Sequence, residues 1–423
     1  MPNSHLWTQE NAHDRAAKVF ARVDADETDT QHIFTQTFAE ECLKSRATPR
    51  TGPLAGALVS VKDLFDVKSF VTRAGTTFLE DTSPADKDAA AIGLLRDAGA
   101  LLIGHTNMTE LAYSGLGLNP HYNTPRNALD PKRIPGGSTS GGAVSVALGL
   151  ADIAVGTDTG GSCRIPAAFN GIVGFKPSQS AISRNGCKPL SQTLDSVGVM
   201  GKSVAMCRAA FEVMATGKDA FKEPVSKGFV IPTNFGMDDL EPLVAKAFKS
   251  AVGRLEAAGH AITYKNVSLF DKLAQFPAWH VTSVECRANY QAAFSQTPKA
   301  FDPRVLSRMK RAEERSAVAY RECLNLRDEL ISEFEIQFTD ETLLMPTVPI
   351  EAPQFSDLRD DASFNSKNLQ VLRNPSVANV MDACSISIPF QFDRGVIGVM
   401  LTAPSKRDDA ILNLADSIER IFE

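Results

Sequence analysis

The stretch G-T-D-T-G-G-S-C-R-I-P-A-A-F-N-G-I-V-G-F-K-P, residues 156–177, is the most informative part of this chain. Gly160 and Gly161 stand directly before Ser162, and adjacent glycines let a backbone approach a small molecule closely. Several backbone amides in such a segment can face a developing negative charge. The stretch therefore indicates a serine hydroxyl beside a place where an oxyanion forms.

A second glycine-rich segment, G-G-S-T-S-G-G at residues 136–142, places Ser138 24 positions before Ser162. Such segments also cradle phosphates, but neither is followed by lysine in the G-x-x-x-x-G-K-[ST] arrangement, so phosphate binding is the weaker interpretation. A serine hydroxyl is a weak nucleophile until a base removes its proton. None of the seven histidines lies in either segment, and no G-x-S-x-G or H-E-x-x-H motif is present. The base that removes the serine proton must therefore be a residue other than histidine.

Lys62 is the candidate base, because the β-prone run from residue 54 to residue 61 places it at the end of a buried strand. An exposed lysine has a pKa near 10.4 and is deprotonated in only about one part in a thousand at neutral pH. Burial lowers that pKa by up to about three units, at a cost of about 4 kcal/mol. The alternative is a lysine whose amine reaches from the strand end into water.

Composition limits the class of protein. The chain has 423 residues, 43% of them apolar, which predicts one large domain or two closely packed lobes. A net charge of −6 argues against nucleic acid and acidic membranes as partners, and favours a small molecule. Residues 1–9 do not resemble a leader, and no apolar run could span a bilayer. Seven scattered cysteines without a C-x-x-C pair favour the cytoplasm.

Alternating strand and helix patterns predict a sheet flanked by helices. Residues 10–43 read as a helical prelude, residues 114–142 as a long functional loop, and the charged run 308–315 as a solvated helix face. Further helices are predicted at 86–98, 142–150, 203–216, 239–258, 407–422 and, in a mostly helical stretch, 270–338. Strands are predicted at 54–61, 101–104, 152–156, 228–231, 261–264, 343–345 and 396–401.

These residues resemble the amidase signature hydrolases. The resemblance runs through residues 54–200 and resumes at 345–347 and 388–389, and the block at 156–177 is its most specific part. It implies an α/β amidase signature fold, with a mixed central β-sheet covered by helices on both faces. The implied organisation is a single domain over residues 1–423. Its parts are a signature core at about 54–205, a more variable helical region at about 206–340, and a C-terminal return to the core at 341–423.

The resemblance also implies a Ser-Ser-Lys triad. Ser162 matches the nucleophile that forms an acyl-enzyme, Ser138 the bridging serine that follows a cis peptide bond, and Lys62 the base. The carbonyl oxygen would lie in an oxyanion hole made by the backbone amides of Thr159, Gly160, Gly161 and Ser162.

The supporting roles are structural in this interpretation. Asp158 and Arg164 are expected to brace the nucleophile segment as an ion pair. Ser140 and Thr139 either orient Ser138 or form loop hydrogen bonds with the backbone, and Asp195 is expected to be structural. The reaction requires no metal and no organic cofactor.

The implied activity is hydrolysis of the C–N bond of a small amide, in a pocket formed partly by residues 108–115 and 270–338. Carbamates, ureas and esters fit the same triad. A glutamine-dependent amidotransferase A-type subunit, which passes ammonia to a partner protein, is a second possibility. A non-catalytic binding protein on the same scaffold is a third. A homodimer is expected from the resemblance alone.

Overall fold

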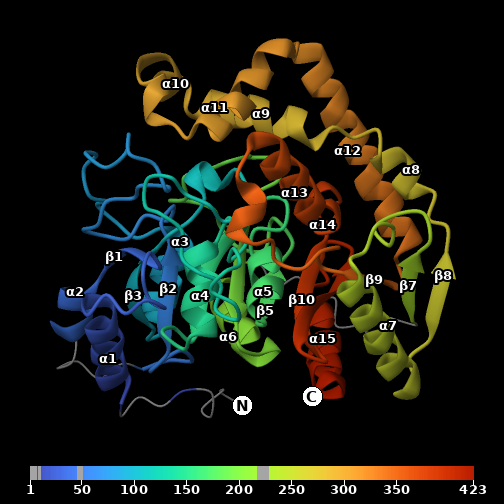
Figure 1. The fold of residues 1–423 in the computed structure, drawn as a ribbon, viewed down its shortest axis with the longest axis horizontal. Coiled ribbons are helices and arrows are strands. Elements are labelled where there is room, and N and C mark those ends of the chain that lie inside the picture. The colour runs from blue at the N-terminus through green and yellow to red at the C-terminus, as the bar shows by residue number, and fades with distance from the viewer. Residues whose placement is uncertain (1–6, 8–10, 45–50, 217–227) are drawn as a thin grey trace.

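The computed structural model describes residues 7, 11–44, 51–216 and 228–423 (Figure 1). Most of the first nine residues, where no leader is expected, therefore lies outside the described chain, as does part of the expected helical region, residues 217–227. In the described ranges the strands are β1 (Phe34–Thr37), β2 (Leu58–Lys62), β3 (Leu101–Thr106), β4 (Ile153–Asp158), β5 (Val173–Lys176), β6 (Ser196–Gly201), β7 (Phe229–Pro232), β8 (Ile262–Lys265), β9 (Thr342–Pro346), β10 (Cys384–Phe392) and β11 (Gly395–Ala403).

These strands form one mixed sheet in the order β1-β3-β2-β4-β6-β5-β10-β11-β9-β7-β8. The pairs β2–β3, β2–β4, β7–β8 and β7–β9 are parallel, and the other neighbouring pairs are antiparallel. Because β2 and β4 run parallel side by side, their carboxyl ends meet at the same edge of the sheet. That edge carries Lys62 and the start of the glycine-rich segment after β4.

Helices cover both faces of the sheet. They are α1 (Ala12–Asp24), α2 (Ala39–Lys44), α3 (Ala90–Asp97), α4 (Ser140–Ala147), α5 (Arg164–Asn170), α6 (Val204–Met214), α7 (Pro242–Ala257), α8 (Leu269–Leu273), α9 (Ala278–Asn289), α10 (Gln291–Gln296), α11 (Pro303–Lys310), α12 (Ala317–Gln337), α13 (Asp361–Arg373), α14 (Ser376–Val380) and α15 (Asp408–Phe422). Helices α3, α6, α7 and α15 share a core with Ile153 and Val155 of β4, whereas α4 and α5 pack with Ala154 on the opposite face. The predicted α/β class is confirmed.

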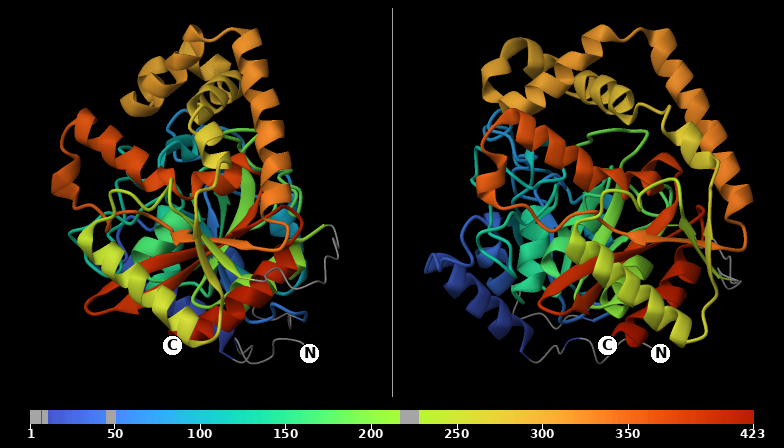
Figure 2. Two further views of the ribbon diagram at one scale, coloured as in Figure 1. Left: turned by 90° about the vertical axis from the view of Figure 1, so that its right-hand side faces the viewer. Right: turned by 45° about the vertical axis from the view of Figure 1, so that its right-hand side comes forward.

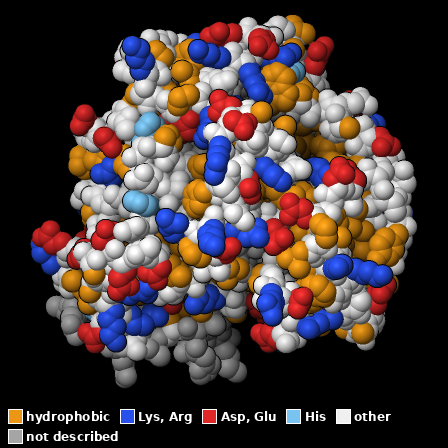
Figure 3. Space-filling view, in the orientation of Figure 1, with side chains coloured by type: hydrophobic (Ala, Val, Ile, Leu, Met, Phe, Trp, Pro, Cys, Tyr) orange, Lys and Arg blue, Asp and Glu red, His pale blue; other side chains and the backbone are white. Residues whose placement is uncertain are grey.

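The segment from α8 to α12 arches over the sheet, as both views in Figure 2 show. It is the mostly helical stretch expected at 270–338, and basic, acidic and hydrophobic side chains are mixed on its surface (Figure 3). No helix of the described chain has the length and apolar character needed to cross a membrane.

Two expectations from the sequence are wrong in part. The segment 10–43 is not helical throughout, because residues 34–37 form β1 and pair antiparallel with β3 at the sheet edge. The charged run 308–315 is not a uniformly solvated face: Arg308 is only 9% exposed, and its guanidinium donates a hydrogen bond to the carbonyl oxygen of Tyr113. Tertiary pairing and packing override the local pattern at both places.

Candidate active site

Lys62 and Ser138 are joined inside the protein. Lys62 is the last residue of β2 and has no exposed surface. Its Nζ donates to Ser138 Oγ at 2.8 Å and to Thr157 Oγ1 at 3.0 Å, and lies 3.4 Å from the Thr157 carbonyl oxygen. Thr157 lies on β4, so the parallel pairing of β2 and β4 brings these groups together. The predicted interior lysine is confirmed, and its amine contacts one of the two predicted serines.

Burial lowers the pKa of Lys62 to about 8. The main cause is desolvation, which disfavours the charged amine, while the negative fields of Cys163, Asp195 and Asp158 act in the opposite direction. An uncharged amine has two hydrogens, which the two Thr157 oxygens can accept, so its lone pair is left to accept the proton of the Ser138 hydroxyl. Lys62 therefore has both the position and the pKa that a general base near neutral pH requires.

Ser138 follows a cis peptide bond from Gly137, as the family resemblance implies. The Ser138 carbonyl oxygen accepts from the Thr109 amide at 3.1 Å, and the next amide, that of Thr139, donates to the Ser162 carbonyl oxygen at 3.3 Å. The two serine segments are therefore adjacent in space. Among the described residues, no hydrogen bond joins the hydroxyls of Ser138 and Ser162.

Asp158 fixes the loop that carries Ser162. Its carboxylate accepts from Arg164 at 2.8 and 3.1 Å and from the backbone amides of Gly161 and Cys163 at 2.8 and 3.1 Å. Asn379 donates to the same carboxylate at 3.0 Å. Burial alone would raise the pKa of Asp158, but the Arg164 charge and hydrogen bonds hold it well below its usual range. The predicted structural ion pair is present, and Asn379 is a partner that sequence reasoning missed.

The backbone amides of residues 159–162 divide into those that are bound within the protein and those that are not. Within the described ranges, the amides of Thr159, Gly160 and Ser162 donate no hydrogen bond to the protein, so they are available to an oxyanion. The amide of Gly161 is already bound to Asp158. The geometry therefore does not support the expectation that Gly161 joins the oxyanion hole through its amide. At Gly161, φ is +125°, and an added Cβ would lie 2.7 Å from a proline ring, so only glycine fits there.

The other supporting side chains hold the backbone. Ser140, the first residue of α4, donates its hydroxyl to the Asn107 carbonyl oxygen at 3.2 Å rather than to Ser138. Thr159 donates its hydroxyl to Asp195 at 2.6 Å, and Asp195 also accepts backbone amides of the segment from Leu190 to Ser191. Asp195 is therefore structural, as expected, and it orients the residue that begins the glycine-rich turn.

Ser162 opens into a cavity of about 130 Å³, called here the Ser162 pocket. Its walls are residues 112–114, Thr159, Gly160, Leu190, Leu194, Ala278, Trp279, Thr282, Leu372, Ser376 and Val380. Residues of both segments expected to form the substrate pocket, 108–115 and 270–338, line this cavity. The side formed by α13 and α14 is not among the predicted walls. Among the described residues of this lining, Tyr113 is the only ionisable group, and burial raises its pKa, so the phenol stays neutral.

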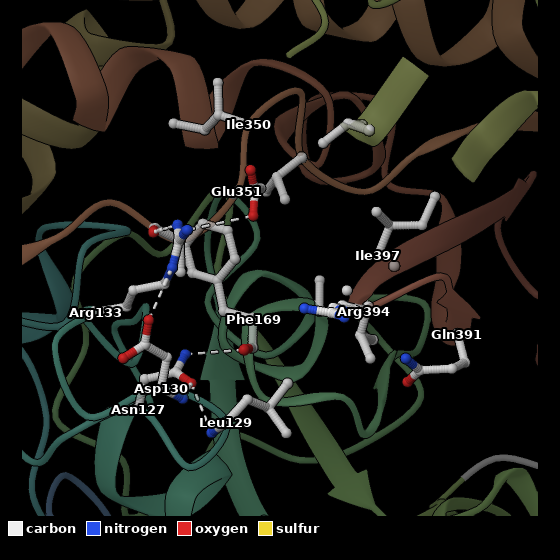
Figure 4. A pocket seen from close by; sticks show the side chains of 17 residues that line it. Asn127, Leu129, Asp130, Arg133, Phe169, Ile350, Glu351, Gln391, Arg394 and Ile397 are labelled. Atoms are coloured by element: carbon white, nitrogen blue, oxygen red, sulfur yellow. Dashed lines mark hydrogen bonds and ion pairs between the residues drawn. The ribbon is translucent and has the colours of Figure 1, made fainter. Parts of the chain in front are cut away.

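A larger hollow of about 500 Å³ lies elsewhere, between α5, α7 and the β10–β11 hairpin (Figure 4). Arg133 spans it through ion pairs with Asp130 and Glu351, each at 3.3 Å. Neither Lys62 nor either predicted catalytic serine lines it. It therefore offers no nucleophile with an adjacent base. The residues that the structure describes also contain no cluster of three or more His, Cys, Asp or Glu side chains placed to hold a metal ion.

Comparison with known proteins independently supports the chemistry that the geometry of the site indicates. The family model described as Amidase matches residues 14–412. The chain is 31% identical to a 2-amino-5-chloromuconic acid deaminase from Comamonas testosteroni, covering 88% of this chain and 82% of the relative. It is 30% identical to a glutamyl-tRNA(Gln) amidotransferase subunit from Symbiobacterium thermophilum, covering 96% and 90%. A crystal structure of an amidase superposes with a TM-score of 0.86 at 29% identity, covering 97% and 96%.

Proposed function

The chain belongs to the amidase family, whose members hydrolyse amide C–N bonds, and on that premise we propose that Ser162, Ser138 and Lys62 are its catalytic triad. The observation that carries the proposal is the 2.8 Å hydrogen bond from the fully buried Lys62 amine to Ser138 Oγ. A lysine held there with a lowered pKa accepts protons, and the neighbouring loop presents Ser162 to a cavity.

The reaction proceeds in two halves. Ser162 Oγ attacks the carbonyl carbon while its proton passes to Ser138 and the Ser138 proton passes to Lys62. The resulting oxyanion faces the free amides of Thr159, Gly160 and Ser162. When the tetrahedral intermediate collapses, the C–N bond breaks, the leaving amine takes a proton from Ser138, and Lys62 returns one to Ser138. Water then attacks the acyl-enzyme by the same proton route and releases the carboxylic acid.

The proton route requires a contact between the hydroxyls of Ser162 and Ser138. A serine hydroxyl reaches a new partner by rotation about χ1, and catalytic hydrogen bonds often tighten only when substrate is bound. The hydrogen bond from the Thr139 amide to the Ser162 carbonyl oxygen keeps the two backbones in register for that contact. Substrate binding in the Ser162 pocket would therefore complete the relay without movement of the surrounding loops.

The lining of the Ser162 pocket favours an uncharged group inside the cavity over the α-ammonium group of glutamine. A cavity of about 150 Å³ holds a benzene ring, so 130 Å³ accommodates a short alkyl chain or a single aromatic ring. Within the described chain no carboxylate lines the cavity, so the α-ammonium group of glutamine would be desolvated there without an acidic partner. We therefore propose a free-standing amidase rather than an amidotransferase component. Carbamates, ureas and esters use the same acyl chemistry and belong in the substrate panel.

Covalent labelling tests the assignment directly. A fluorophosphonate should add one adduct to the intact protein, on Ser162, and Ser162→Ala should abolish both the adduct and amide hydrolysis. Ser140→Ala is the matched control, because its hydroxyl serves only the backbone, and it should still be labelled. A folded sample that hydrolyses an amide while Ser162 remains unlabelled would refute the covalent mechanism. Loss of all activity without labelling would favour the binding-protein alternative.

Three further expectations complete the proposal. We propose that the enzyme works in the cytoplasm, given its scattered cysteines, and that it needs no cofactor, because the triad supplies both nucleophile and base. A homodimer is also proposed, on the family resemblance alone. Light scattering coupled to gel filtration would give a mass near 91 kDa for a dimer, about twice the 45.6 kDa chain.

A further inference from the structure

The wall of the Ser162 pocket is in contact with two arginines. Trp279, on α9, lines the pocket together with Ser162. The guanidinium carbons of Arg315 and Arg311 lie 4.5 and 5.5 Å from the centroid of the Trp279 ring. Arg311 opens the short turn Arg311–Glu314, which packs against α9. Two cations therefore border the same side chain that closes one side of the pocket.

Neither arginine is fully neutralised by the protein. Among the described residues, Arg315 has a single acid neighbour, Glu314, at 3.7 Å, and its Nε is buried without a hydrogen-bond partner. No ion pair of Arg311 is found among the residues that the structure describes, and Glu313, two positions along the chain, is paired with Arg287 at 3.0 Å. Neither arginine lines the cavity itself, but each contacts its Trp279 wall, and a guanidinium with unused donors is a ready partner for a carboxylate.

A third arginine strengthens the positive field at the pocket wall. Arg308 donates to the Tyr113 carbonyl oxygen, and its Nη2 is buried without a partner in the part of the chain that the structure describes. The negative charge of Asp302 acts on Arg308, and the Asp302 carboxylate accepts the Arg304 amide at 2.8 Å. Glu110 accepts the Asp302 amide at 3.0 Å and contacts His121 at 2.5 Å. Burial is the main cause of the raised Tyr113 pKa, and the positive charges of Arg308 and Arg311 act against that rise. The field of these arginines thus reaches the pocket lining.

The proposal rests on the amidase function proposed above. We propose that Arg311 and Arg315 determine specificity by binding an anionic group at the far end of the acyl chain. The preferred substrates are then small amides with an apolar body that fills the Ser162 pocket and a carboxylate that emerges beside Trp279. The walls of the pocket carry no charge, and two incompletely paired arginines contact its Trp279 wall. Together these features favour a substrate with an uncharged body inside the pocket and an anionic group outside it.

Paired substrates test the proposal. Benzamide and 4-carbamoylbenzoate carry the same scissile amide and differ only in the para carboxylate. The unaltered enzyme should favour 4-carbamoylbenzoate in kcat/KM by about five- to twentyfold, the product of two partly exposed ion pairs. Arg311→Gln and Arg315→Gln should each lower this ratio by about two- to fivefold. Raising the salt concentration should lower the ratio as well, because exposed charge pairs are screened.

Arg321→Gln is the matched control. Arg321 is an exposed arginine on α12 that contacts Asn325 and Asp328, and it makes no contact with Trp279. Its substitution removes the same charge and should leave the ratio unchanged. If Arg321→Gln lowered the ratio of the two kcat/KM values equally, the preference would depend only on the net charge of the protein, and the proposal would be overturned. The ratio itself is insensitive to a partial loss of folded protein, because both substrates are measured on one sample.

Binding of the two amides can also be compared without hydrolysis, by measuring how far each one protects Ser162 from labelling by a fluorophosphonate. Stronger protection by 4-carbamoylbenzoate than by benzamide, lost in Arg311→Gln, would support the proposal even if both amides react slowly. Equal protection, or hydrolysis of benzamide with a ratio of one, would refute the role of the arginines while leaving the triad intact. Failure of the triad would instead show as an unlabelled Ser162 in a folded protein.

Discussion

The most direct test of the mechanism is the pH dependence of kcat/KM for a neutral amide such as benzamide. If neutral Lys62 is the base, the rate follows the fraction of Lys62 that has lost its proton. The amine is fully buried, and its pKa is lowered to about 8. We therefore expect kcat/KM to rise with pH and to level off above an apparent pKa near 8.

The magnitude follows from the shift of the Lys62 pKa. At pH 7, a lysine with a pKa of about 8 is roughly 9% neutral, whereas one at the ordinary value of 10.5 is roughly 0.03% neutral. The difference of about 2.5 units is worth about 300-fold in available base. Between pH 7 and pH 9 the neutral fraction rises from about 9% to about 91%, so kcat/KM should rise about tenfold.

The assay must separate Lys62 from two other buried groups that titrate in this range. Burial raises the pKa of Asp63, the next residue along the chain, to about 7. Burial raises the pKa of Glu110 to about 8, and Glu110 lies two residues before a pocket wall. Glu110→Gln should keep the step near pH 8, while Lys62→Ala should lose the step and most of the rate at neutral pH. A flat profile from pH 6.5 to 9.5, or a step that disappears with Glu110→Gln, would refute Lys62 as the base.

Three further outcomes follow from the same geometry. The pKa of Lys62 is lower in the folded than in the unfolded protein, so the folded protein binds fewer protons between about pH 8 and 10.5. Urea titration should therefore show that the free energy of unfolding rises by up to about 3 kcal/mol over this pH range. The Lys62→Met variant should not show this rise. Arg164→Met should cost about 3 to 5 kcal/mol in denaturant unfolding, because buried Asp158 loses its partner. Gly161→Ala should lower kcat by more than about tenfold, because the added Cβ displaces the loop that carries Ser162. Gly253→Ala is the control and should leave kcat unchanged, because an added Cβ meets nothing within 4 Å there.

The parts of the site that the sequence predicts are those with a local signal. Ser138 and Ser162 stand in glycine-rich segments, and Lys62 ends a β-prone run, so each appears without knowledge of the fold. The amphipathic helices α7 and α15 likewise show their period within a single window of sequence. Such features depend mainly on residues that are close in the sequence, so a local sequence pattern is enough to predict them.

Other features depend on distant contacts and leave little local trace. Strand β10 does alternate apolar residues from Cys384 to Phe392, a period-two signal that could have revealed it, although Pro389 interrupts the run. The short strand β1 has no such pattern and exists because β3 offers it an edge. The pocket walls supplied by α13 and α14, and the cationic contacts of Trp279, arise from packing between segments far apart in the sequence.

The nucleophile loop itself depends on the C-terminal part of the chain. Arg164, which holds Asp158, also donates to Asn379 at 2.9 Å and to Ser385 Oγ at 3.3 Å. Asn379 in turn donates to the Asp158 carbonyl oxygen at 2.8 Å. All three bonds are buried, and the two that Arg164 donates are charge-assisted, so losing them would leave the buried Asp158–Arg164 pair with fewer polar partners. The proposed catalytic residues therefore all lie between residues 62 and 162, but α14 and β10 supply partners of the Asp158–Arg164 pair, which in turn binds the loop that carries Ser162.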